Sequence, residues 1–249
     1  MEALSVYKKK YHVDYGDSDY YKNLKLSSLF NYLQDIASLH SENLGIGINY
    51  IQQKFNVAWV MVRILVDIDR MPHWNEDIFI ETWPMEPKKL EFERDFIVRD
   101  QQGNVLVSAI SSWVILDVDK REIRKSELIK REYPAFEEKR AIDGRMGKLK
   151  PNGELSHVYS RKIGYSDIDI NGHLNNSKYI DYITDCFSLK DHGKYTAKSL
   201  QVSYVNEAMA GETIILHKDV SELESGSVYV EGINETGDKV YFKACITAN

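Results

Sequence analysis

The chain has only two cysteines among its 249 residues, Cys186 and Cys245, and neither belongs to a paired-cysteine motif. This scarcity excludes a disulfide scaffold and a zinc ribbon and favours a reducing compartment, although two thiols are enough for one bridge. Proline and glycine are also sparse, at 5 and 14 residues, which excludes a collagen-like fibre. With 43% hydrophobic and 28% charged residues, the composition is that of a globular protein with a substantial core.

Long hydrophobic runs and an excess of positive charge are absent as well. The most apolar stretch, residues 57–66, contains Arg63 and is too short to span a bilayer. The first residues do not resemble a secretory signal, so we expect a cytoplasmic protein that does not insert into membranes. The net charge of −6 disfavours a nucleic-acid binder.

The charge is unevenly distributed. Residues 120–150 hold eleven Lys and Arg against six Asp and Glu, and apolar residues are sparse there. The pattern predicts a basic connector at 126–155 between an N-terminal unit, 1–125, and a C-terminal unit, 156–249. The connector is either a solvated linker or a landing surface for an acidic partner.

The two units look like copies of one another. A constant offset of 150 residues aligns seven identical residues without a gap, which indicates an internal repeat. The matched pairs are Tyr15 with Tyr165, Asp17 with Asp167, Asp19 with Asp169, Leu24 with Leu174, Ser27 with Ser177, Tyr32 with Tyr182 and Asp35 with Asp185.

In each copy a helical pattern is followed by strand-like segments. Apolar residues recur at helical spacing over 26–37 and 179–187. Strands are predicted at 57–66, 78–83, 90–99 and 105–116, and again at 199–205, 213–220, 227–233 and 239–247. The spacing requires an insertion in the first copy, placed at 41–56, where it would cover a pocket as a lid. The predicted fold class is α+β, a tandem hotdog in which each antiparallel sheet wraps a long helix and the two sheets join edge to edge.

Polar residues gather at the helix entrance of the second copy. Asp169, Asn171 and His173 occupy alternate positions, so an extended chain would turn them toward one cavity, and Gly172 would let a ligand approach the backbone. Backbone N–H groups of Gly172, Leu174 and Asn175 would stabilise a carbonyl oxygen that gains negative charge, as acyl transfer requires. The alternative is that these residues only form turns and caps.

The first copy has Asp19, Tyr21 and Asn23 at the matching positions, so the sequence predicts one working site. A water nucleophile also needs a base. Glu207 is the candidate, because it follows the strand at 199–205 and a sheet edge would bring it to the helix entrance.

The segment from Asp169 to Tyr179, with Asn171, His173 and Asn175 at the same spacing, resembles the active-site motif of the acyl-acyl carrier protein thioesterases. Further segments resemble this family over nearly the whole chain, namely residues 62–63, 69–74, 80–83, 94–100 and 109–114. The resemblance implies a double hotdog that releases free fatty acid from acyl carrier protein and so ends chain elongation. It also implies that Asp169, Asn171, His173 and Glu207 are catalytic.

Plant members of this family commonly have a cysteine directly after the glutamate, where this chain has Ala208. A cysteine nucleophile at that position is therefore excluded, and water attack promoted by Glu207 is favoured, with direct attack by Glu207 left open. No Gly-x-Ser-x-Gly elbow occurs, no His/Cys spacing near His173 suits a metal, and no cofactor is implied.

Acyl carrier protein is small and acidic, so Lys125, Lys130 and Arg131 are candidate docking residues. Trp59, Met61, Ile64 and Trp83 are candidates for an acyl pocket in the first hotdog. A coenzyme A thioesterase of the same fold and a non-catalytic acyl-binding protein remain alternatives. The sequence leaves open the preferred chain length and whether two copies form a homodimer.

Overall fold

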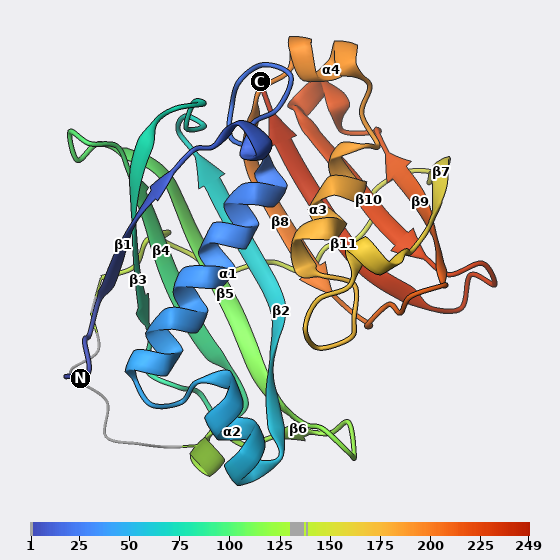
Figure 1. Ribbon diagram of the computed structural model, residues 1–249. Coiled ribbons are helices and arrows are strands. Elements are labelled where there is room, and N and C mark those ends of the chain that lie inside the picture. The colour runs from blue at the N-terminus through green and yellow to red at the C-terminus, as the bar shows by residue number, and fades with distance from the viewer. Residues whose placement is uncertain (1, 130–136, 138) are drawn as a thin grey trace. The chain divides into compact units, whose positions relative to one another are not determined.

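The structure is a computed structural model that describes residues 2–129, 137 and 139–249 (Figure 1). The chain divides into two compact units. The first comprises Met1–Leu24 and Asn31–Arg145, and the second comprises Lys25–Phe30 and Met146–Asn249. The break between Arg145 and Met146 falls inside the predicted connector, whereas Lys25–Phe30 of the predicted N-terminal unit are grouped with the second unit. No helix formed by the described residues combines the length and the apolar character that crossing a membrane requires.

The first unit holds β1 (Tyr7–His12), η1 (Tyr15–Asp17), α1 (Leu26–Asn43) from Asn31 onward, α2 (Ile48–Phe55), β2 (Val57–Ile68), β3 (Asp77–Pro84), β4 (Phe92–Arg99), β5 (Val105–Asp117), β6 (Ile123–Arg124) and η2 (Ser126–Ile129). Its antiparallel strands run in the order β1-β3-β4-β5-β2, and β6 pairs with β5. Helix α1 lies across one face of this sheet (Figure 1).

The second unit holds β7 (Ser156–Lys162), η3 (Tyr165–Asp167), α3 (Asn176–Thr184), α4 (Leu189–Lys194), β8 (Ala197–Tyr204), β9 (Thr213–Asp219), η4 (Leu223–Ser225), β10 (Ser227–Ile233) and β11 (Val240–Ala248). Its strand order, β7-β9-β10-β11-β8, repeats that of the first unit. Helix α3 lies against this sheet (Figure 1). The predicted α+β hotdog architecture is confirmed in each unit.

The repeat extends to an isolated antiparallel β-bridge at each of the two helix entrances. Ser18 bridges Leu24 in the first unit, and Ile168 bridges Leu174 in the second, at the same offset of 150. Helix α3 begins after its cap, Asn175, whose side chain accepts from the Ser177 N–H at 2.9 Å. Capping of this kind satisfies an N–H group that has no partner within the helix.

The predicted insertion at 41–56 holds the end of α1 and helix α2, and its role as a lid stays a prediction. Helix α1 extends to Asn43, and the residues that follow pack into the core of the first unit. Their burial is explained by an apolar cluster, because such side chains are stabilised when they leave water together. The cluster consists of Leu44, Ile46, Ile51, Val57, Phe92, Ile115 and Ile129.

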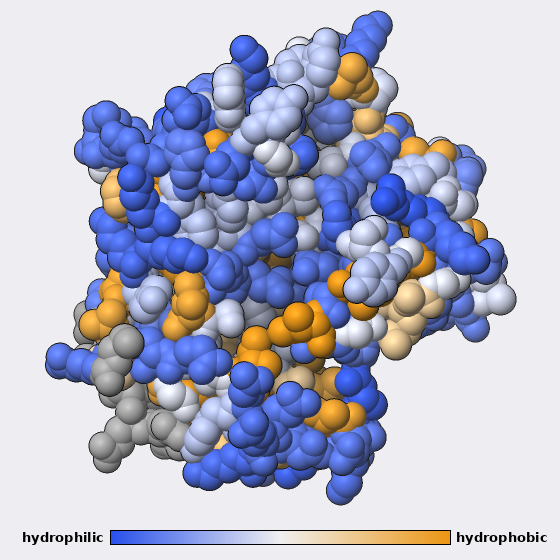
Figure 2. All heavy atoms as spheres, in the orientation of Figure 1, coloured by the Kyte–Doolittle hydropathy of each residue, from blue (hydrophilic) through white to orange (hydrophobic). Residues whose placement is uncertain are grey.

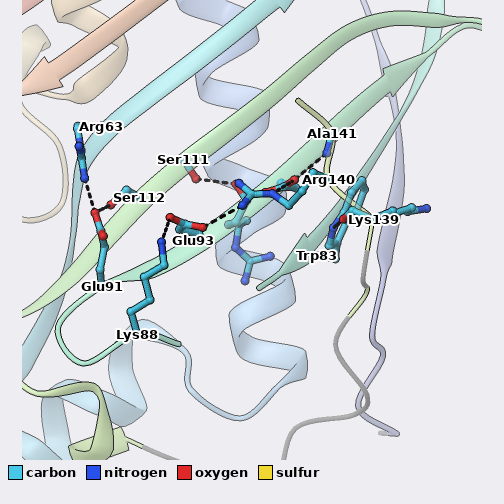
Figure 3. A network of polar contacts seen from close by, with 12 residues as sticks. Arg63, Trp83, Lys88, Glu91, Glu93, Ser111, Ser112, Lys139, Arg140 and Ala141 are labelled. Carbon is cyan, nitrogen blue, oxygen red and sulfur yellow. Dashed lines mark hydrogen bonds and ion pairs between the residues drawn. The ribbon is translucent and has the colours of Figure 1, made fainter. Parts of the chain in front are cut away.

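Part of the connector is anchored to the sheet of the first unit, on the face opposite α1 (Figure 3). Arg140 donates to Asp95 Oδ2 at 3.0 Å and to Glu93 Oε2 at 3.1 Å, and the Ala141 N–H donates to Asp95 Oδ2 at 2.7 Å. The Asp95 side chain is fully buried, and burial raises its pKa although the Ala141 N–H and Arg140 oppose that shift. A solvated linker therefore does not describe residues 139–141.

The connector is also anchored where it enters the second unit. The carboxylate of Asp219 accepts the N–H groups of Asn152 and Gly153 at 2.8 and 2.6 Å. These bonds, with one from the Ser221 N–H, lower the pKa of Asp219 to about 2. The contacts of Asn152 and Gly153 with Asp219 use backbone N–H groups of the connector rather than its side chains.

A buried polar cluster between α1 and β4 was not expected from the sequence. His40 of α1 is fully buried, with Nε2 2.8 Å from the Leu4 carbonyl and Nδ1 2.9 Å from Arg94. Since the guanidinium can only donate, Nδ1 must accept and the imidazole is neutral. Burial, followed by the charge of Arg94, lowers the pKa of His40 to about 4.

This cluster predicts a pH dependence of stability. Between about pH 6.5 and pH 4, His40 is protonated in the unfolded chain but stays neutral in the folded chain. The free energy of unfolding therefore falls as the pH drops. The loss amounts to up to about 3 kcal/mol for His40 alone. Urea unfolding across this range should show that His40→Gln, a neutral side chain with a donor and an acceptor, loses less stability than the wild type. Parallel pH curves for the two proteins would contradict the assignment.

Candidate active site

The segment that enters α3 is a tight loop rather than an extended strand. The Gly172 N–H donates to the Asp169 carbonyl at 3.0 Å, and the Asp169 N–H donates to the His173 carbonyl at 2.9 Å. Gly172 has a φ of +80°, in the left-handed region, and a Cβ added there would meet nothing within 4 Å. The glycine therefore serves the turn. The expectation that Asp169, Asn171 and His173 share one side of an extended chain is wrong.

Asp169 organises this loop. Its Oδ1 accepts the Asn171 N–H at 2.8 Å, and its Oδ2 lies 3.5 Å from Asn171 Nδ2. The same carboxylate position in the first unit, Asp19, accepts the N–H groups of Tyr21 and Asn23 at 2.9 and 2.8 Å. Asp169 thus holds the backbone turn and orients the Asn171 amide.

The structure brings Glu207 to His173. Glu207 Oε2 lies 3.3 Å from His173 Nε2, and the two side chains are 35% and 24% exposed. One residue further along each segment, the Leu174 N–H donates to the Ala208 carbonyl at 2.9 Å. This backbone bond between the neighbouring residues keeps the carboxylate and the imidazole within reach of one another.

The N–H groups expected to polarise a carbonyl are already engaged. Gly172 donates to Asp169, Leu174 donates to Ala208, and Asn175 donates to the Asp167 carbonyl at 2.9 Å. The expectation that these three backbone donors receive the substrate carbonyl is therefore wrong, because the loop folds back and uses them itself. The side-chain amide of Asn171, which is an exposed residue, is the remaining candidate donor to the substrate carbonyl oxygen.

The first unit lacks the pair. Its loop makes the matching bond from the Leu24 N–H to the Pro72 carbonyl at 2.7 Å, so Asn23 and Met71 stand where His173 and Glu207 stand in the second unit. The sequence comparison found Asn23 but missed Met71, because the offset between the copies changes after the helix. The asymmetry between the copies therefore includes the base as well as the imidazole.

Several large side chains near the second helix entrance are exposed, which the sequence analysis did not anticipate. Tyr165 is 96% and Ile170 87% exposed, and Val205 and Met209 on either side of Glu207 are 50% and 45% exposed. Figure 2 shows a largely hydrophilic face broken by separate hydrophobic patches. Exposed apolar groups around a polar pair are typical of a site that contacts a partly apolar ligand.

The four pocket candidates do not share one face of their sheet. Opposed residues in an antiparallel pair point to the same side. Ile64 shares a row with Arg94, which bonds His40 of α1, and Trp59 and Met61 lie on this same inner face. Trp83 lies on the opposite face, where its Nε1 donates to the Lys139 carbonyl at 3.2 Å. Trp83 is therefore withdrawn as a lining residue.

Other proposed residues are placed as follows. Lys125 is exposed beside η2, whereas Lys130 and Arg131 lie outside the described residues. Both cysteines are free, and burial raises the pKa of Cys186 to about 12, so its thiol is not an activated nucleophile. In the described part of the chain, no three His, Cys, Asp or Glu side chains gather so that they could hold a metal ion.

The chain is similar to known thioesterases. Residues 4–133 match the acyl-ACP thioesterase N-terminal domain, and residues 152–247 match the acyl-ACP thioesterase C-terminal domain. Oleoyl-acyl carrier protein thioesterase 2 of Arabidopsis thaliana is 25% identical over 86% of this chain and 63% of its own length. Palmitoyl-acyl carrier protein thioesterase of the same plant is 28% identical over 75% of this chain and 48% of its own length. The chain thus spans less than two thirds of these relatives.

Solved structures share the fold. An acyl-ACP thioesterase from Bacteroides thetaiotaomicron is 24% identical with a TM-score of 0.85, and the match covers 98% of both chains. The 12:0-ACP thioesterase from Umbellularia californica is 20% identical with a TM-score of 0.86, covering 98% of this chain and 94% of that one. Because the two domain models match in order over most of its length, the chain belongs to the acyl-ACP thioesterase family.

Proposed function

We propose that this protein hydrolyses the thioester between a fatty acyl chain and acyl carrier protein, releasing the free fatty acid. The observation that carries the proposal is the 3.3 Å approach of Glu207 to His173 at the entrance of α3. Family membership and the names of the relatives support the acyl carrier protein as the partner. A cytoplasmic location remains the sequence-based prediction.

Glu207 is the base of the proposed reaction. As a carboxylate it takes a proton from water while the water oxygen bonds to the thioester carbonyl carbon. The tetrahedral intermediate then collapses and the carbon–sulfur bond breaks. The proton that Glu207 took passes to His173 across their contact, and His173 delivers it to the departing thiolate, so both residues return to their starting states and the products are a fatty acid and the thiol of the carrier. Direct attack by Glu207, giving an anhydride that water then cleaves, would use the same carboxylate.

Asn171 and Asp169 have supporting roles in this scheme. The Asn171 amide donates to the carbonyl oxygen as negative charge develops on it, which is the kind of interaction that accelerates acyl transfer most. Asp169 keeps that amide in place through the two contacts described above. The acyl chain is proposed to extend along the inner face that Trp59, Met61 and Ile64 share.

Loss of either member of the pair should abolish most turnover. Glu207→Ala removes the base and His173→Ala removes the proton donor, so each should lower kcat by roughly a hundred- to ten-thousand-fold. The matched control is Asn23→Ala, at the equivalent of His173 in the first unit, which should keep turnover near the wild-type rate. If Glu207→Ala or His173→Ala also kept that rate, the residue would have no place in the mechanism.

The substrate class is tested with a ladder of esters. Acyl chains of increasing length, joined either to acyl carrier protein or to coenzyme A, are incubated with the protein, and the released fatty acids are identified. Faster hydrolysis of the carrier-protein esters supports the proposal. Preference for coenzyme A esters would point to the alternative enzyme, and binding without release would point to an acyl-binding protein.

Docking of the acidic carrier should depend on the basic connector. Reversing Lys125, Lys130 and Arg131 to glutamate should raise KM for carrier-protein esters, without affecting coenzyme A esters, and the difference should shrink as salt is added. Lys125→Glu alone is compared with Lys190→Glu, an equally exposed lysine on α4. An unchanged KM in the triple variant, with activity insensitive to salt, would remove these residues from the docking surface.

A further inference from the structure

The loop that carries Glu207, residues 205–212, is attached to the rest of the second unit on both sides of this residue. On the C-terminal side, the Ala208 carbonyl accepts the Leu174 N–H at 2.9 Å. On the N-terminal side, the loop is attached to the start of β11, a strand that pairs with both β8 and β10. The Glu207 carboxylate therefore projects from a backbone segment whose two neighbouring residues are both bonded to other parts of the unit.

The attachment to β11 contains an irregular step in the hydrogen-bond ladder. The N–H groups of Val205 and Asn206 both donate to the Tyr241 carbonyl, at 2.8 and 3.1 Å. Two residues of the loop thus oppose one residue of β11, as in a β-bulge. The Asn206 side chain bonds the adjacent carbonyl, since its Nδ2 donates to Val240 at 2.7 Å. Asn206 thereby uses its backbone amide and its side-chain amide to hold the position directly before Glu207.

The corresponding loop of the first unit, residues 69–76, contains the same irregular step. The N–H groups of Asp69 and Arg70 both donate to the Leu106 carbonyl, at 3.0 and 3.2 Å. Arg70 therefore corresponds to Asn206, which agrees with the match already found for the two residues that follow. The backbone makes the same contacts in both loops, so the side chains at this position can be compared directly.

The side chain at this position is anchored in both loops, but by different partners. Arg70 turns back on its own loop, where Nη1 and Nη2 donate to the carboxylate of Glu76 at 2.9 and 2.8 Å. Asn206 reaches out of its loop to β11. Glu212 corresponds to Glu76, because the carboxylate of each accepts the N–H of the residue three positions before it, at 2.7 and 2.8 Å. The position before Glu207 is thus one at which a side chain secures the loop in either unit.

We propose that Asn206 is a positioning residue for Glu207, and that its bonds to β11 hold the backbone so that the carboxylate stays within reach of His173. The inference rests on the proposed function, since it assigns Glu207 the role of base. Only the second unit has a His–Glu pair to position, so the same kind of anchor that serves folding in the first unit serves the reaction here. A small displacement of a reacting group is enough to slow a chemical step.

The test begins with Asn206→Ala, which removes the side-chain amide. Asn206 is exposed, so water can bond the Val240 carbonyl in its place and the variant should fold, which thermal unfolding checks. We expect kcat to fall about 5- to 20-fold, because a displaced base slows the chemical step. KM for the acyl-carrier-protein ester should change less than about twofold, because substrate binding is untouched.

The matched control is Arg70→Ala, at the equivalent position of the first unit. It removes three hydrogen bonds, to Glu76 and to the Met71 carbonyl, whereas Asn206→Ala removes one. Arg70→Ala should therefore lower the thermal unfolding midpoint more than Asn206→Ala does. Its kcat should nevertheless stay within about twofold of the wild type, because no reacting group follows it. If Asn206 served stability alone, the larger loss of kcat would follow the larger loss of stability.

Asn206→Arg gives a second test. The arginine can bond Glu212 as Arg70 bonds Glu76, because the backbone makes the same contacts in both loops. This variant should recover most of the activity that alanine loses and reach a kcat within about threefold of the wild type. Should Asn206→Arg fail to fold, the comparison of Asn206→Ala with Arg70→Ala decides the question alone.

Four results would overturn the inference: a wild-type kcat in Asn206→Ala, a loss that appears in KM rather than in kcat, equal losses of kcat in Asn206→Ala and Arg70→Ala, or a folded Asn206→Arg no more active than Asn206→Ala. Failure of the proposed function gives a different result. If Glu207→Ala retains full turnover, the proposed reaction itself is wrong. If Glu207→Ala is inactive while Asn206→Ala has the wild-type kcat, only the role of Asn206 is wrong.

Discussion

The hydrogen bond between the Leu174 N–H and the Ala208 carbonyl is the contact on which the candidate site depends. His173 and Glu207 come from segments more than thirty residues apart, on either side of α4 and β8. Neither segment is a regular element at that point, so ladder hydrogen bonds do not set their spacing. The Leu174–Ala208 bond joins the two segments directly, next to the residues whose side chains approach to 3.3 Å.

The two units share a backbone framework and differ in the side chains of the candidate site. Both keep the same strand order, the same bridge at the helix entrance and an aspartate that closes the entry turn. The groups that differ are His173 and Glu207 in one unit against Asn23 and Met71 in the other. Because the first unit keeps these backbone contacts without the His–Glu pair, the contacts serve folding, and the proposed activity depends on a few side chains carried by that framework.

The sequence was sufficient for the parts of the structure that depend on periodicity. Apolar spacing located α1, α3 and the four strands that follow in each copy, but not β1, β6 or β7, and the offset of 150 residues revealed the duplication. It was insufficient where one residue's surroundings decide the outcome. The alternation of Asp169, Asn171 and His173 suggested an extended chain, but Gly172 at positive φ makes a turn. Trp83 has the spacing of a core residue, yet register alone decides which face of β3 it occupies. His40 gave no signal, since a buried histidine is recognisable only from its partners, Leu4 and Arg94.

The way the connector is fastened has a consequence for how its sequence can change. Asp95 and Asp219 grip it largely by the amide hydrogens of Ala141, Asn152 and Gly153, which every residue except proline possesses. Two positions need their side chains as they are: Arg140, whose guanidinium pairs with Asp95 and Glu93, and Gly153, where a Cβ would lie 2.7 Å from that of Ser221. The interval between the two matched domains, residues 134–151, covers most of this stretch. Apart from those two positions, substitutions along this stretch can change its side chains and its net charge while the backbone contacts with Asp95 and Asp219 remain.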